Sequence, residues 1–72
     1  MISPKDEFQK ALDTLIALET ACAEARLPDN WYMPRVDRAH ILIRDKRHYA
    51  ELRSILIELV EALQAKEKRK RN

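Results

Sequence analysis

Apolar side chains recur at helical spacing along the first third of the chain. Between residues 8 and 25 they are separated by alternating steps of three and four residues, the repeat of a helix that packs one face in coiled-coil fashion. Ser3 followed by Pro4 is typical of a helix start, and Pro28 disfavours helical geometry in the residue before it. The pattern predicts a helix over about residues 4–26.

The last third of the chain has the same spacing from Tyr49 onward. Asp45 is a good N-cap, so the pattern predicts a helix over about residues 46–68, which runs into a basic tail at 66–72. Additional apolar residues flank the seam in both helices, so each face is broader than one partner helix can cover. The seams predict a core made of Phe8, Leu12, Leu15, Leu18, Cys22, Leu52, Leu56, Leu59 and Leu63.

The connection at about residues 27–45 is harder to assign. Within it, residues 36–44 fit a helix, with Val36, Ala39 and Ile43 on one side, or a strand, with Ile41 and Ile43 on one face. A helix is favoured because an isolated strand needs a partner and no second strand is visible.

Composition places the chain in the all-α class. It has 72 residues and no glycine, and its commonest residues are good helix formers. The two predicted helices match in length, which favours a hairpin of two long antiparallel helices joined by an irregular or short-helix connection. A core this small is marginal, and a single cysteine excludes an internal disulfide. We therefore expect a homodimer of hairpins that forms a four-helix bundle.

Several classes of function are disfavoured by the sequence. No nucleophile elbow, phosphate-binding glycine loop or zinc-protease helix is present, so we expect no enzyme activity and no cofactor. Asp37 lies three residues before His40 and Glu51 three residues after His48, which is too little to indicate a metal site. No stretch approaches the apolar length of a membrane span, and acidic residues follow the N-terminus where a secretory signal would be apolar. We expect a cytoplasmic protein with no membrane partner.

Aromatic and basic residues cluster in the predicted connection. The stretch LPDNWYMPR contains the only tryptophan, and basic residues follow it through His48. Aromatics, Met and Arg are enriched in protein-binding hot spots. We therefore expect a non-catalytic adaptor, regulator or inhibitor that binds a larger protein through a WYM loop and the adjacent cations, namely Trp31, Tyr32, Met33, Arg35, Arg38, Arg44, Lys46 and Arg47.

Alternatives remain open at this stage. Trp31 and Tyr32 could instead fold back and close the end of the bundle. The basic segment 35–48 and the tail could bind nucleic acid, although the net charge is only +2 and phosphate binding depends on clustered cations. The chain could also be a structural subunit whose broad apolar faces are covered by a larger assembly.

Overall fold

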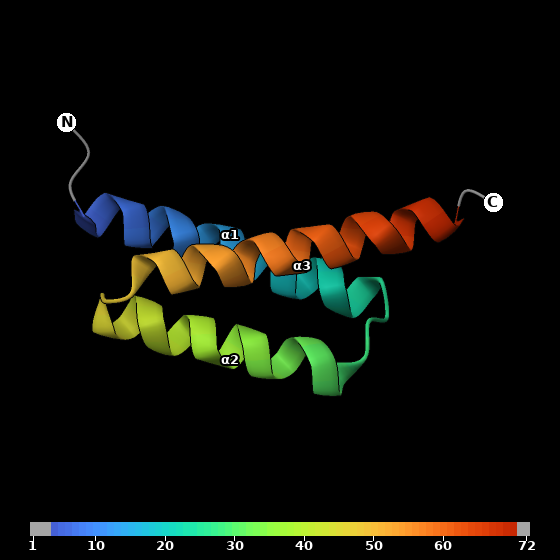
Figure 1. Cartoon of the computed structure of the whole chain (residues 1–72), viewed down its shortest axis with the longest axis horizontal. Coiled ribbons are helices and arrows are strands. Elements are labelled where there is room, and N and C mark those ends of the chain that lie inside the picture. The colour runs from blue at the N-terminus through green and yellow to red at the C-terminus, as the bar shows by residue number, and fades with distance from the viewer. Residues whose placement is uncertain (1–3, 71–72) are drawn as a thin grey trace.

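The computed structural model describes residues 4–70 and contains three helices: α1 (Pro4–Glu24), α2 (Asp29–Asp45) and α3 (Tyr49–Lys70). The predicted all-helical class is confirmed. The chain runs up, down and up again, so that α2 is antiparallel to both of its neighbours (Figure 1). Each helix contacts the other two, which makes the fold a three-helix bundle.

The segment expected to be an irregular or short-helix connection is a helix of 17 residues. Helix α2 begins directly after Pro28 and continues through Pro34 to Asp45, so residues 36–44 are helical rather than extended. A full helix between the two predicted ones reverses the chain twice. As a result α1 and α3 run parallel to each other (Figure 1), and the antiparallel hairpin of long helices is not what forms.

Packing explains why α2 is helical despite its proline. Tyr32, Val36, Ala39 and Leu42 are buried and follow each other at steps of four and three residues, which places them on one face of a helix. Pro34 lies on the exposed side. Burial of this apolar face against α1 and α3 offsets the hydrogen bond that the proline cannot donate.

The core lies along the axis between the three helices. Of the core residues expected from the sequence, Phe8, Leu15, Cys22, Leu52 and Leu59 are buried, Leu18, Leu56 and Leu63 are partly buried against them, and Leu12 lies at the edge. Ile55 and the buried face of α2 complete the core. Helix α2 thus covers apolar surface of α1 and α3 that would stay exposed in a hairpin of those two helices alone.

Both turns of the bundle are built without glycine. Arg26 and Lys46 have φ of 60° and 55°. In the first turn, the amides of Arg26 and Leu27 donate hydrogen bonds to the carbonyls of Ala23 and Cys22. In the second turn, the amides of Lys46 and the next residue donate to the carbonyls of Ile43 and Leu42. This is the Schellman arrangement, which usually has glycine at the left-handed position. Both turns therefore hold strain that a Cβ atom creates.

Two sequence features lie at the edges of the described chain. Ser3, the expected helix cap, is outside the described residues. The basic tail begins inside α3, which continues to Lys70, and its last two residues are also outside them. None of the helices described here is long and apolar enough to cross a membrane.

Candidate functional site

The three large apolar residues of the expected WYM loop lie in the first turns of α2. Tyr32 is a core residue with 6% of its surface exposed, whereas Trp31 and Met33 are half-buried and pack against the core. Burial and the neighbouring Asp29 carboxylate raise the pKa of the Tyr32 phenol. The expected loop is therefore part of the bundle wall, and Tyr32 has a packing role.

Arg35 is held by its own helix and by α3. Its guanidinium lies over the Trp31 ring, 4.3 Å from the ring centroid, and its Nη1 donates a 2.7 Å hydrogen bond to the Trp31 carbonyl. Its Nε lies 3.5 Å from Glu58 Oε2 on α3 and has no hydrogen-bond partner within the described chain. Arg35 thus bridges α2 and α3 over the indole, with 34% of its side-chain surface still exposed.

Arg38 makes a second connection between α2 and α3, about one turn farther along. Its Nε and Nη2 donate hydrogen bonds of 2.8 and 3.2 Å to the two carboxylate oxygens of Glu51, the bidentate geometry typical of strong arginine pairs. The bond from Arg38 lowers the pKa of the Glu51 carboxyl. Two of the arginines expected to contact a partner are therefore used within the bundle.

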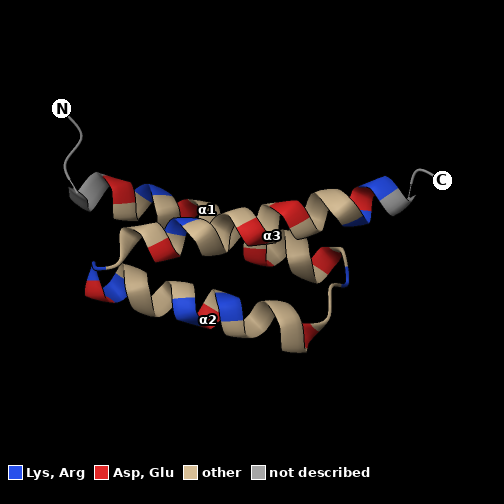
Figure 2. Cartoon of the chain, in the orientation of Figure 1, with Lys and Arg blue, Asp and Glu red and all other residues tan. Residues whose placement is uncertain are grey.

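The remaining expected cations gather at the turn between α2 and α3. Arg44 is exposed and lies 3.6 Å from Asp45, and Lys46 and Arg47 are exposed within the turn itself. Figure 2 shows basic segments at this end of the molecule and others at the far end of α3. The cations of the described chain therefore do not form one continuous patch.

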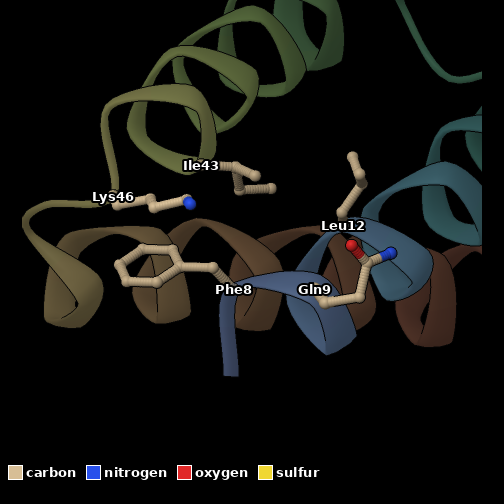
Figure 3. A pocket seen from close by; sticks show the side chains of 5 residues that line it. All are labelled: Phe8, Gln9, Leu12, Ile43 and Lys46. Carbon is tan, nitrogen blue, oxygen red and sulfur yellow. The ribbon is translucent and has the colours of Figure 1, made fainter. Parts of the chain in front are cut away.

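A cavity of about 230 Å³ adjoins this basic turn. It is lined by Phe8, Gln9, Leu12, Ile43 and Lys46, which come from α1, from the end of α2 and from the turn; we call these residues the α1–α2 pocket. Figure 3 shows the Lys46 ammonium group between Ile43 and Phe8, with Leu12 and Gln9 opposite. The pocket thus combines an apolar wall with one cation.

The apolar surface continues beyond the pocket along α1. Ile16 follows Leu12 by four residues, which places it on the same side of the helix one turn away, and 51% of its surface is exposed. Of this whole surface, the sequence pointed only to Lys46 as a binding residue. The sequence did not indicate Gln9 and Ile43 as binding residues, because they come together only through the packing of α1 against α2.

The cysteine and histidine side chains considered as reactive or metal-binding residues do not come together in a site within the described chain. Cys22 is fully buried, and burial raises the pKa of its thiol. His40 Nε2 lies 3.6 Å from Glu19 Oε1. Within the described part of the chain, no three His, Cys, Asp or Glu side chains come together in a group that could hold a metal ion. Glu58 is exposed and pairs with Arg35 across the α2–α3 interface.

A second hollow lies at the far end of the bundle, between α1 and α3. It measures about 310 Å³ and is lined by Ala21, Ala25, Leu63, Lys66 and Glu67.

Comparisons with protein-family models, with curated proteins and with solved structures gave no match to this chain. The function must therefore be argued from the surfaces themselves.

Proposed function

We propose that this protein is a non-catalytic interaction module that binds a segment of a larger protein at the α1–α2 pocket and the adjoining basic turn. The observation that carries the proposal is the α1–α2 pocket, where the Lys46 ammonium group lies beside the apolar side chains of Phe8 and Ile43. Arg44 and Arg47 are exposed next to it. Such a site fits a segment that inserts an apolar side chain and places a carboxylate near the cations.

The size of the pocket favours a protein segment over a small molecule. Its volume of about 230 Å³ is below the roughly 300–1,000 Å³ of typical small-molecule sites, and it is suited to one large apolar side chain. Exposed Ile16, one turn along α1, extends the apolar surface. An amphipathic helix with anchors one or two turns apart fits this surface.

This proposal moves the binding site away from the tryptophan. Trp31 and Tyr32 contribute packing, and Arg35 and Arg38 connect α2 with α3. Of the cations expected to bind a partner, Arg44, Lys46 and Arg47 are exposed at the turn and make no salt bridge to another helix within the described chain. The expected homodimer is a separate proposal, which concerns a different face and is developed below.

The experiment uses two designed helical peptides as probes and amide NMR spectra of the full chain as the readout. Both peptides carry leucines at helical spacing; one has glutamates on its polar side and the other has lysines. We expect the acidic peptide to shift the amide signals of Leu12, Ile16, Ile43 and Lys46, and the basic peptide to bind at least about tenfold more weakly. Equal binding of both, or shifts elsewhere, would overturn the proposal.

Variants of the pocket sharpen this test. Lys46→Gly removes the ammonium group and also relieves the left-handed backbone at this position, so weaker binding cannot be attributed to unfolding. Ile16→Asp should also weaken binding of the acidic peptide. The matched control is Ile41→Asp, because Ile41 is 41% exposed but does not line the pocket, and this variant should bind normally.

Nucleic acid is the alternative that the same protein samples can address. A single-stranded 20-nucleotide DNA and a duplex of the same length are added at about 50 mM salt, where phosphate contacts are strong. Because the cations are spread over all three helices and interrupted by acidic segments (Figure 2), we expect no binding that exceeds that of the acidic peptide. Tight DNA binding that is lost in Lys46→Gly and Arg47→Ala would replace the proposed partner.

A further inference from the structure

One side of α3 carries an ordered strip of exposed side chains. Arg53, Ile57 and Glu61 follow each other at four-residue steps, and all three are exposed. Ile57 is 46% exposed, and Val60 beside it is 37% exposed. Neither Arg53 nor Glu61 forms a salt bridge within the part of the chain whose side chains are described. The strip therefore reads cation, apolar residue, anion along the helix.

The surface of α1 beside α3 includes two small side chains, Ala17 and Ala21. Ala21 lines the hollow that α1 shares with Leu63 of α3. Ala17, one turn earlier on the same side of α1, is exposed. Small residues allow another helix to approach closely. The face shared by α1 and α3 thus combines exposed apolar residues on α3 with short side chains on α1.

We propose that this face binds a second copy of the chain, with the two α3 helices antiparallel and Ile57 on the two-fold axis. Arg53 and Glu61 are both four residues from Ile57, so each lies about 6 Å from it along the helix. An antiparallel copy therefore places each Arg53 next to the Glu61 of the other copy. The same strip supplies both halves of the interface, as a two-fold dimer requires.

The order of charges selects this orientation. In a parallel pairing centred on Ile57, each Arg53 would face another Arg53 and each Glu61 another Glu61, and such like-charge contacts are unfavourable. The antiparallel pairing forms two opposite-charge contacts that flank Ile57 and Val60. Charge complementarity within one strip thus identifies a second copy as the occupant.

The available surface is large enough for such a dimer. A stable interface typically buries about 800 Å² from each partner, which is roughly one seventh of the 5538 Å² accessible surface of this chain. One face of the bundle, shared by two of its three helices, can supply this area. The α1–α2 pocket takes no part in the pairing, so both surfaces can be occupied at once.

The first test measures mass against concentration by sedimentation equilibrium. We expect a reversible dimer for the natural chain and at least about tenfold weaker dimerisation for Ile57→Asp, because two carboxylates would then meet on the axis. Ile41→Asp is the control, since Ile41 is similarly exposed but lies on α2. A monomer at all concentrations up to the millimolar range, or a dimer unaffected by Ile57→Asp, would overturn the proposal.

Charge exchange tests the register itself. Arg53→Glu and Glu61→Arg should each weaken the dimer, and the double variant should restore it, because the pairs are re-formed with the charges reversed. A double variant weaker than both single ones would overturn the antiparallel register. These exposed positions keep the test valid even if Ile57→Asp folds poorly.

Oxidative cross-linking gives an independent readout. Ile57→Cys should form a disulfide-linked dimer readily because the two thiols meet on the axis, whereas Ile41→Cys should not. Native Cys22 is fully buried and does not interfere. Faster cross-linking at position 41 than at 57 would contradict the arrangement. If the natural chain binds the acidic peptide but forms no dimer, the proposed function stands and this inference fails. If it forms the dimer but does not bind the peptide, this inference stands and the proposed function fails.

Discussion

The guanidinium of Arg35 covers the indole of Trp31 at 4.3 Å from the ring centroid. The same guanidinium donates a hydrogen bond to the Trp31 carbonyl and lies near Glu58 of α3. A tryptophan that the sequence presents as a binding residue is therefore covered by its own chain. The stacked pair contributes to the stability of the α2–α3 interface.

Replacing Arg35 should destabilise the protein and expose Trp31. Arg35→Met removes the planar guanidinium that covers the ring, and with it the cation and the hydrogen bond, which together contribute about 1 kcal/mol. We expect the free energy of unfolding to fall by about this amount and the emission of Trp31 to shift to longer wavelength. Urea unfolding followed by tryptophan fluorescence measures both. Arg47→Met, in the exposed turn, is the control and should change neither; an unchanged emission in Arg35→Met would contradict the stacking.

Glycine at the first turn should stabilise the protein. Arg26 has φ of 60°, and a left-handed conformation costs a non-glycine residue about 1–2 kcal/mol, while glycine loses about 0.5–1 kcal/mol more on folding through its greater freedom. Arg26→Gly is therefore expected to raise the free energy of unfolding by about 0.5–1 kcal/mol in a urea titration.

The control for Arg26→Gly is the same replacement inside a helix. Lys66→Gly in α3 should lower the free energy of unfolding by about 1 kcal/mol. If both replacements destabilise the protein equally, the backbone at position 26 is not left-handed.

Pro34 lies inside α2 and has no amide to donate to the carbonyl of Asn30. Both residues are exposed, so water can solvate that carbonyl, and the cost is below the roughly 3 kcal/mol of a buried helix interior. Pro34→Ala should raise the free energy of unfolding by about 1–2 kcal/mol, measured by urea unfolding. A decrease would mean that the proline stabilises the start of α2 through its rigidity.

The two outer helices could be predicted from the sequence, whereas α2, which contains Pro34, could not be predicted over its full length. The seams of α1 and α3 repeat without interruption, so their existence and much of the core followed from the spacing. In α2 the apolar residues are fewer, and Pro28 and Pro34 are local signals against a helix. The helix is stabilised by tertiary packing, in which Tyr32, Val36, Ala39 and Leu42 join a core shared with both other helices.

The site was less predictable than the fold for the same reason. Composition identified the basic turn, because cations cluster in sequence at Arg44, Lys46 and Arg47. It could not separate these from Arg35 and Arg38, whose acidic partners are 23 and 13 positions away along the chain. The α1–α2 pocket depends on the contact of two helix ends and has no local pattern.

The Arg38–Glu51 pair should make stability depend on pH in a defined direction. Arg38 lowers the pKa of Glu51 in the folded protein. A carboxyl whose pKa is lower when folded adds stability at pH values above its unfolded pKa, and this contribution is lost as the pH falls through the folded pKa. Glu51→Gln should therefore destabilise the protein at about pH 7, and its effect should shrink as the pH falls toward about 2.

Urea unfolding of both proteins at each pH measures this difference. The matched control is Asp37→Asn, since Asp37 is an exposed carboxylate of α2 with no salt bridge to the described side chains, and its effect should be small at both pH values. Because the pair is partly exposed on both sides, added salt should reduce the effect of Glu51→Gln at neutral pH. An effect of Glu51→Gln that persists unchanged in acid would show that Glu51 acts through packing and not through its charge.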